Sequence, residues 1–327
     1  MVKSAYIMNL DKFIQNQGWS MYGIVSFEEI QKNLEKHETI FKEWLKKGYE
    51  ADMSYLEKME DDRFHPENKL TDVKSVIVLG ALYADSGLRI PNSANKGVIA
   101  KYAAGKDYHK VLKKKLIGLS NWLKSNVKGQ MSNVETYASV DSGPTVDRVL
   151  AETAGLGFFG KNCNIINPKM GSFFFIASLM TNLELLPTEK MRMPSCGDCR
   201  KCMDACPTGA IISPGVIDAR KCISYLTIEN KGDIPKELHS KIGNHLFGCD
   251  ECQNCCPFNQ RKQKILIDEF KPENGVGESL DPEEVLSIKT DEEFIEKFAG
   301  TPLMRAKLKG LQRNARIVIK SGKLKNN

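Results

Sequence analysis

Residues 195–211 read SCGDCRKCMDACPTGAI, and the cysteine spacing in this stretch decides the fold of the module around it. Its four cysteines follow the Cys-x2-Cys-x2-Cys-x3-Cys-Pro run with which bacterial ferredoxins hold iron–sulfur clusters: Cys196, Cys199, Cys202 and Cys206. Three thiolates at three-residue intervals can bind three irons of one cluster, whereas the fourth, followed by Pro207, points to a second cluster. One such run therefore predicts a partner run.

A second cysteine run supplies that partner. Residues 247–259, FGCDECQNCCPFN, repeat the pattern but are one ligand short of the first run. Cys222, which lies between the two runs, can provide the missing thiolate. Crossed pairing then predicts two clusters with four cysteines each: Cys196, Cys199, Cys202 and Cys256 for one, and Cys206, Cys222, Cys249 and Cys252 for the other.

The remaining cysteines and the compartment fit this interpretation. Of the 10 cysteines in the chain, only Cys163 lies outside the span from Cys196 to Cys256, and clustered thiols in a reducing cytosol are more often metal ligands than disulfides. Two structural zinc sites are the alternative, but zinc does not need this run or its repeat. Cys163 and Cys255 are left over and are expected to be small buried apolar residues.

Two neighbouring clusters can transfer electrons, but their presence does not indicate which reaction the electrons drive. An electron carrier alone needs little more than the cysteine module. The long segment before the module is therefore expected to hold a redox site at which the electrons are used.

The segment before the cysteines contains helical patterns. Three stretches carry apolar residues at helical spacing: 27–48, 53–62 and 111–126. A further helix is predicted to begin at Pro144, a favourable first helical residue, and to end near Gly155. A helix with a basic face is predicted over 305–320.

Strand patterns alternate with these helices. Four apolar or β-branched runs have strand character: 74–84, 134–140, 163–167 and 172–185. The turn-like residues 168–171 predict that the last two runs pair as a hairpin. The fold class is therefore α+β. We predict an α/β domain over residues 1–186, a ferredoxin-like two-cluster module over 187–265, and a basic helical region over 266–327.

The charges are distributed unevenly along the 327 residues. Residues 297–327 hold 9 Lys and Arg and no Asp or Glu, whereas the other 296 residues hold 38 basic and 41 acidic side chains. A basic tail on a nearly neutral body indicates a polyanionic partner. No run is long and apolar enough for a membrane helix, and the first 20 residues lack the apolar core of a signal peptide. We therefore expect a soluble cytosolic monomer.

Four segments resemble, in the same order, those of the epoxyqueuosine reductases, enzymes of queuosine modification of tRNA. They are VDSGPTVDRVLAETAGLGFFGKN (140–162), RKCISYLTIE (220–229), FGCDECQNCCPFN (247–259) and GTPLMRAKLKGLQRNA (300–315). The resemblance covers most of the chain, from about Tyr55 to Arg316. Its SGP turn and CISYLTIE segment are not general ferredoxin features.

The resemblance implies cobalamin, bound in a nitroreductase-like α/β domain next to one cluster. It also implies the reaction: two-electron removal of the epoxide oxygen of epoxyqueuosine in the tRNA anticodon loop, with electrons from an external donor passing through the clusters. Corrinoid domains with a histidine ligand carry Asp-x-His-x-x-Gly, and the nearest string here, from Asp107 through His109, ends in Leu112 instead of Gly. This departure fits a cobalamin without a histidine ligand.

The resemblance also assigns site residues. Asp141 is the implied proton donor, a role that burial would favour by raising its pKa and that the following helix N-terminus would oppose. The alternative is a turn or capping aspartate. Cobalamin contacts are implied by segment: Arg63, Tyr102, Asp141, Lys161, Asn162, Gly171, Ser172 and Ser224. Tyr102 and His109 either reach the active site or belong to an exposed loop.

The basic tail is expected to contact tRNA phosphates, which dominate the affinity of nucleic-acid binding. The residues are Arg305, Lys307, Lys309, Arg313 and Arg316. A solvated helix face is the alternative. Two other functions remain open at this point: a cobalamin-dependent reductive dehalogenase, and a ferredoxin-like carrier whose N-terminal domain holds no cofactor.

Overall fold

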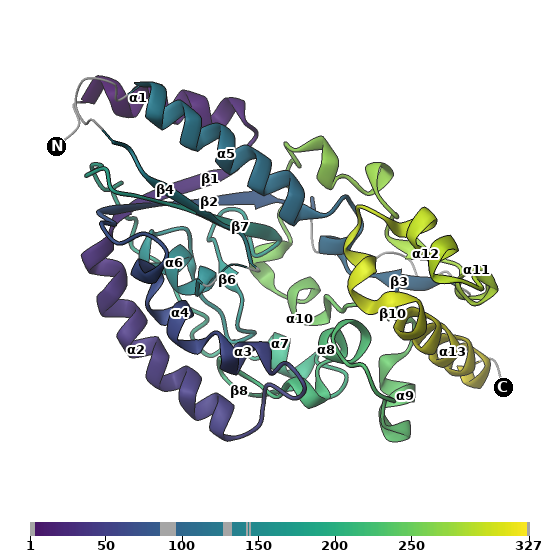
Figure 1. The fold of residues 1–327 in the computed structure, drawn as a ribbon. Helices are drawn as coiled ribbons and strands as arrows, with labels where there is room; N and C mark the ends of the chain where they lie inside the picture. The colour runs from purple at the N-terminus through teal and green to yellow at the C-terminus, as the bar shows by residue number, and fades with distance from the viewer. Residues whose placement is uncertain (1–3, 86–95, 127–132, 142, 144, 326–327) are drawn as a thin grey trace.

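A four-stranded antiparallel sheet lies between two layers of helices in the N-terminal part of the computed structural model, which describes residues 4–85, 96–126, 133–141, 143 and 145–325 (Figure 1). In spatial order its strands are β1 (Met21–Ser26), β2 (Ser75–Leu82), β7 (Phe174–Thr181) and β4 (Thr136–Ser139). Each pairs antiparallel with its neighbour. Every residue of β2 is buried, as expected of a continuous apolar run covered on both faces.

Helices cover both faces of this sheet. One face carries α1 (Ser4–Asn16) and α5 (Tyr108–Asn126), and the other carries α2 (Phe27–Lys46) and α6 (Asp147–Thr153) (Figure 1). Because side chains alternate along a strand, Ile77 and Leu79 of β2 pack into the first layer, whereas Val76 and Val78 pack into the second. The N-terminal part is thus a three-layer α/β/α arrangement.

The cysteine-rich segment folds into short elements beside the sheet. Its helices are α7 (Lys201–Asp204), α8 (Ile223–Ile228), α9 (Lys236–Ile242) and α10 (Glu251–Asn254). Its strands are β8 (Ile211–Ser213), β9 (Val216–Ile217) and β10 (His245–Phe247). The two helices that accompany the cysteine runs, α7 and α10, contact each other.

A small second sheet joins the three predicted segments. β3 (Gly97–Ile99) pairs in parallel with β10 and antiparallel with β11 (Ser279–Leu280). The C-terminal helices are α11 (Pro282–Ser287), α12 (Asp291–Phe298) and α13 (Lys307–Lys325), and α13 packs on α11 and β10. Because this sheet takes one strand from each of the three predicted segments, it does not separate them. The predicted domain boundaries at residues 186 and 265 therefore stay a prediction.

Most of the predicted elements are confirmed. The runs 27–48, 74–84, 111–126, 134–140 and 305–320 correspond to α2, β2, α5, β4 and α13. The stretch 53–62 forms two short helices, α3 (Tyr55–Lys58) and α4 (Glu60–Phe64). The helix expected from Pro144 begins at Asp147, and Pro144 lies outside the described residues.

The predicted hairpin of the runs 163–167 and 172–185 is wrong. Residues 168–171 do form a tight turn, closed by a bridge between Asn167 and Gly171. However, β6 (Ile165–Ile166) pairs with β5 (Phe158–Phe159), and β7 pairs with β2 and β4. β7 therefore pairs over eight residues with β2 and over four with β4, whereas β6 is only two residues long.

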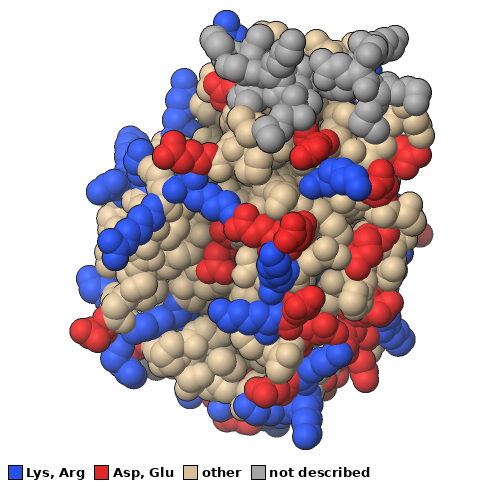
Figure 2. All heavy atoms as spheres, turned by 90° about the vertical axis from the view of Figure 1, so that its left-hand side faces the viewer, with Lys and Arg blue, Asp and Glu red and all other residues tan. Residues whose placement is uncertain are grey.

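The surface agrees with the charge count of the body. On the face that carries α2, acidic and basic side chains are interspersed instead of gathered by sign (Figure 2). Within the described part of the chain, no helix combines the length and apolar character needed to span a membrane.

Candidate functional site

The four thiols assigned to the first cluster line one small cavity. Its volume is about 60 Å³, and its cysteines are Cys196, Cys199, Cys202 and Cys256. Cys199 is exposed, whereas Cys202 and Cys256 are buried. Because Cys202 lies in α7 and Cys256 comes just after α10, the contact between these two helices brings the two cysteine runs together. We call these four cysteines the outer set.

The other four predicted ligands form a second group: Cys206, Cys222, Cys249 and Cys252. Burial raises the pKa of the Cys252 thiol, and the nearby thiols of Cys249, Cys222 and Cys206 raise it further. Cys222 is the N-cap residue of α8 and also borders a much larger cavity. We call these four cysteines the inner set. The structure thus brings together the same two groups that crossed pairing predicts.

All ten cysteines are free thiols. Cys255 donates its Sγ–H to the Cys252 carbonyl at 3.5 Å, and Cys163 borders the larger cavity instead of packing in a core. Among the described residues, no three His, Cys, Asp or Glu side chains lie close enough to hold a single metal ion.

The larger cavity has a volume of about 1250 Å³ and lies where the three segments of the chain meet. Aromatic rings make up much of its lining: Phe41, Trp44, Tyr55, Tyr102, Tyr108 and Phe159. α8 contributes its capping residues Cys222 and Glu229, and the short helix η7 (Pro302–Ala306) contributes Arg305. The cavity is large enough and apolar enough to receive a bulky, flat organic group.

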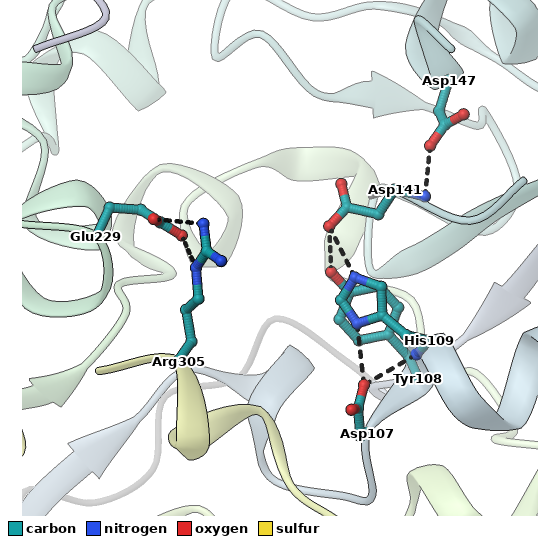
Figure 3. A network of polar contacts seen from close by, with 7 residues as sticks. All are labelled: Asp107, Tyr108, His109, Asp141, Asp147, Glu229 and Arg305. Atoms are coloured by element: carbon teal, nitrogen blue, oxygen red, sulfur yellow. Dashed lines mark hydrogen bonds and ion pairs between the residues drawn. The ribbon is translucent and has the colours of Figure 1, made fainter. Parts of the chain in front are cut away.

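A network of polar side chains borders the cavity (Figure 3). Asp141 lies two residues after the end of β4, and its Oδ2 accepts a hydrogen bond from the Tyr108 hydroxyl at 2.5 Å. His109 Nε2 lies 3.4 Å from the same oxygen, and His109 Nδ1 lies 2.9 Å from Asp107 Oδ1. The Tyr108 ring stacks on Phe175 of β7 at 4.2 Å, which fixes the hydroxyl beside Asp141.

The contacts in this network shift the pKa values of Asp141 and His109 in opposite directions. Desolvation raises the pKa of Asp141, but hydrogen bonds from His109 and Tyr108 and the charges of His109 and Arg63 outweigh it, so the pKa lies below its usual value. Desolvation lowers the pKa of His109, but Asp107 and Asp141 outweigh it and raise the pKa to about 9. At neutral pH Asp141 is therefore a carboxylate, and the titratable proton of the pair is on His109.

Four of the predicted cobalamin contacts border the larger cavity: Arg63, Tyr102, Asp141 and Ser224. The Nε atom of Arg63 is buried and has no hydrogen-bond partner among the described residues, which is uncommon for a buried polar group. Ser224 donates to the carbonyl of Cys249 at 3.4 Å and so links the cavity to the inner set.

The other four predicted contacts do not line the larger cavity, and their role stays a prediction. Lys161 and Asn162 line the small cavity of the outer set, where Lys161 donates to the Gly197 carbonyl. Ser172 is buried, and it bonds Gln253 and Asn259 of the cysteine module. Gly171 abuts the same Asn259 with a φ of +75°, where a Cβ would come within 2.0 Å of the amide oxygen. Lys161 and Ser172 thus contact the cysteine-rich segment and do not line the larger cavity.

The five basic residues predicted to contact tRNA divide in two. Arg305, Lys307, Lys309 and Arg316 are exposed. Arg305 also borders the cavity, where its Nε and Nη2 each donate to Glu229 at 2.8 Å, across from Asp141 (Figure 3). Arg313 is half-buried and donates to the carbonyls of Leu226, Asn230 and Gly232. Its guanidinium is thus used within the protein.

Sequence reasoning did not identify Asp107, Tyr108, Asp147 or Glu229 as site residues, and it left His109 undecided. The Asp-Tyr-His string at 107–109 was visible, but only as an imperfect cobalamin motif. Asp141, which contacts this string, lies 32 residues after His109, just past the end of β4. No local spacing indicates that contact.

Comparison with known proteins identifies the class. A family model described as "4Fe-4S double cluster binding domain" matches residues 195–259, the stretch that holds both cysteine sets. Together with the large cavity beside the inner set, this match defines an iron–sulfur oxidoreductase. A second model, described as "Epoxyqueuosine reductase QueG, DUF1730", matches residues 63–142.

Similar proteins define the family. The chain is 40% identical to an epoxyqueuosine reductase of Leadbetterella byssophila over 96% of this chain and 98% of the relative. It is 37% identical to that of Pseudomonas aeruginosa over 88% of this chain and 78% of the relative. A crystal structure of epoxyqueuosine reductase with an epoxyqueuosine-modified tRNA-Tyr stem loop matches with a TM-score of 0.81 and 33% identity, over 98% of this chain and 82% of that one. The chain belongs to the epoxyqueuosine reductase family.

Proposed function

We propose that this chain removes the epoxide oxygen of epoxyqueuosine in the anticodon loop of tRNA and gives queuosine and water. The oxygen leaves as water, which takes up two protons, and the substrate takes up two electrons, so the site must deliver both. The observation that carries the proposal is that Cys222, a predicted cluster ligand, and Asp141, an acid–base group, border the same cavity of about 1250 Å³. A reductive dehalogenase or a simple electron carrier is not favoured, since the relatives are epoxyqueuosine reductases.

The cofactors of this family are two [4Fe–4S] clusters and cobalamin. The residues around the larger cavity fit a corrinoid: several aromatic rings line it, and the buried Arg63 Nε has no hydrogen-bond partner among the described residues. Arg63, Tyr102 and Ser224 would hold it, and residues 1–186 would form the nitroreductase-like domain around it. When bound, cobalamin supplies the metal centre that donates electrons to the substrate.

The cysteine sets support a direction for electron flow. The outer set includes the exposed Cys199, whereas the inner set includes Cys222 at the cavity. We assign one cluster to each set, as crossed pairing predicts. An external donor would reduce the outer cluster, and the inner cluster would face the cavity. The ferredoxin-like module over residues 187–265 thus serves as the electron entry of the enzyme.

Protons follow a different route, from the network around Asp141. The side chain of Asp141 is 64% exposed, and because it borders the cavity this surface faces the substrate space. We propose that Asp141 delivers the proton to the departing oxygen and that His109, protonated at neutral pH, restores it. Because its pKa lies below the usual value, Asp141 rests as a carboxylate and takes up one proton from His109 before it protonates the oxygen. The second proton of the departing water comes from solvent.

The substrate side of the cavity supports tRNA as the partner. Arg305 borders the cavity, and the exposed Lys307, Lys309 and Arg316 follow it along α13, where phosphates of an anticodon loop could bind. Arg313 is not part of this proposed surface, because its donors are used inside the protein. The modified base would leave its stack and enter the cavity, as RNA recognition of loops requires.

The test is reduction of epoxyqueuosine-containing tRNA by the cluster- and cobalamin-loaded protein with a chemical reductant, read by mass spectrometry of the nucleosides. The parent protein is expected to produce queuosine. Asp141→Asn, which cannot carry the proton, is expected to lose about 10²–10⁴-fold in rate with cofactors retained. Asp268→Asn, at an exposed aspartate paired with Lys271, is the matched control and should behave like the parent. No queuosine from the parent protein, or full activity of Asp141→Asn, would contradict the proposal.

A further inference from the structure

The backbone of Asp141 is held in an unfavourable conformation. Its φ is +47°, in the left-handed region where a residue with a Cβ is disfavoured. Tyr108 and His109 contact only the carboxylate of Asp141, so they do not fix its backbone. Some other group must therefore keep the peptide in this conformation.

Asp147, the first residue of α6, is that group. Its Oδ2 accepts a hydrogen bond from the Asp141 backbone N–H at 2.9 Å (Figure 3), and its Oδ1 accepts one from the Thr145 hydroxyl at 2.6 Å. Thr145 Oγ1 in turn lies 2.8 Å from Ser139 Oγ at the end of β4, and both hydroxyls belong to buried residues. One carboxylate thus ties together both ends of the turn that carries Asp141.

The contacts are not those of a helix cap. Among the described residues, no backbone N–H of the first turn of α6 donates to a carboxylate oxygen of Asp147, and both oxygens accept hydrogen bonds from residues that precede the helix. The turn is also packed tightly, since a Cβ on Gly143 would come within 2.0 Å of Ser139 Oγ. The side chain of Asp147 therefore acts on the position of Asp141 more than on the stability of its own helix.

The electrostatics support the same conclusion. Burial raises the pKa of Asp147 to about 7, and the nearby charge of Asp141 adds to this effect, although the Thr145 hydrogen bond opposes it. Two carboxylates so close together destabilise each other when both are ionised. Such an arrangement is more typical of a functional site than of a structural turn.

We propose that Asp147 is a positioning residue for the reaction, which holds the Asp141 backbone so that the Asp141 carboxylate stays beside Tyr108 and His109. Through the role of Asp141, this inference rests on the proposed function. Asp147 itself touches neither substrate nor cofactor in the proposal. Asp147 affects the reaction through the hydrogen bond that it accepts from the Asp141 backbone N–H, which positions the Asp141 side chain.

The kinetic test compares Asp147→Ala, which removes both acceptors, with Asp147→Asn, which keeps one acceptor oxygen. At equal iron and cobalamin content, Asp147→Ala is expected to lower kcat by about 10²-fold with KM for tRNA unchanged, because misplacement of a catalytic group by about 1 Å costs this much. Asp147→Asn should recover much of the loss. Asp281→Ala is the matched control, since Asp281 also accepts a backbone N–H, that of Glu283 at 2.8 Å, away from the cavity.

A role in stability alone predicts a different result. Asp147→Ala would then unfold at a lower temperature but keep the parent kcat per cofactor-loaded molecule, and this outcome overturns the proposal. The proposal also fails if Asp147→Asn is as slow as Asp147→Ala, because the acceptor oxygen would then not be what matters.

A second measurement separates this inference from the proposed function. Hydrogen exchange at the Asp141 amide needs no substrate, and Asp147→Ala is expected to accelerate it by at least about tenfold, the equivalent of one lost hydrogen bond. If the parent protein does not reduce epoxyqueuosine but exchange accelerates, only the proposed function is wrong. If the parent is active and the Asp141 amide exchanges at the parent rate in Asp147→Ala, the positioning role is wrong.

Discussion

The outer and inner cysteine sets have the same composition but different surroundings. The outer set lines a cavity of about 60 Å³ and includes the exposed Cys199, whereas the inner set is reached through Cys222 from a cavity of about 1250 Å³. A group that must accept electrons from another protein needs an edge at the surface, and one that reduces a bound cofactor needs an edge at the cavity. The difference between the two sets therefore suggests the direction of electron flow.

Removal of an inner ligand is expected to have the largest effect. Cys222→Ser should lose the inner cluster, and with it all reduction of epoxyqueuosine by any reductant, because the last step before the cavity is missing. Iron analysis and nucleoside mass spectrometry measure the two losses. Cys255→Ser is the control from the same module, since Cys255 belongs to neither set, and it should keep parent iron content and activity. Activity in Cys222→Ser with half of the iron gone would overturn the assignment of the inner set.

The next largest effect is expected from His109, the proposed source of the proton that Asp141 delivers. Because Asp107 and Asp141 raise the pKa of His109 to about 9, its protonated fraction falls as the pH rises through that value. The rate of the parent enzyme should therefore decline above about pH 9. His109→Gln should lower kcat by about 10²-fold at neutral pH and abolish this decline, as expected for loss of a proton store.

The control for His109 is another histidine. His65→Gln, at an exposed residue beside Glu67, should keep both the rate and its decline. A decline that persists unchanged in His109→Gln would assign it to another group and would leave Asp141 without its proposed source of protons.

Loss of an outer-set ligand is expected to lower activity less than loss of Cys222 when the reductant is a small molecule. Cys199→Ser should lose the outer cluster, but dithionite-reduced methyl viologen can reach the inner cluster without it. A measurable fraction of the parent activity should therefore remain, in contrast to Cys222→Ser. Equal and complete loss in both variants would mean that small reductants also enter through the outer set.

The cysteines show how far sequence alone can lead. Ligand spacing is local chemistry, so the two runs predict which thiols can share a cluster, and the structure brings the same two groups together. The strand and helix patterns were likewise sufficient for β2, α5 and α13. The pairing of β7 was not, because it depends on distant partners and not on the turn at residues 168–171.

The cavity shows where prediction from sequence ends. Asp141 could be assigned by resemblance, but its carboxylate form depends on Tyr108 and His109, which only the packing of α5 against β7 brings to it. Of the residues assigned by segment, Lys161 lines the small cavity of the outer set and Ser172 donates to Gln253, whereas Arg63 and Ser224 line the larger cavity. Sequence proximity does not specify the direction in which a side chain points.

The smallest effects are expected on tRNA binding. Arg305 and Arg313 belong to the same basic segment but should differ in their effects on binding and on stability. Arg305 is 54% exposed in its side chain and pairs with Glu229, so Arg305→Gln should change stability little. It should weaken binding of the tRNA anticodon stem loop a few-fold and lower the slope of log affinity against log salt by about 1, because one phosphate contact is lost.

Arg313→Gln should behave in the opposite way. Arg313 donates to the Leu226 carbonyl at 2.7 Å and to the Asn230 carbonyl at 2.9 Å, and hydrogen bonds from a charged group contribute about 1.5–3 kcal/mol. Its loss should lower the unfolding temperature and leave the salt slope of tRNA binding unchanged. Thermal unfolding and binding titrations at several salt concentrations measure both variants. If Arg313→Gln, and not Arg305→Gln, reduces the salt slope, then RNA binding must release Arg313 from the protein, and the surface proposed along α13 must be redrawn around it.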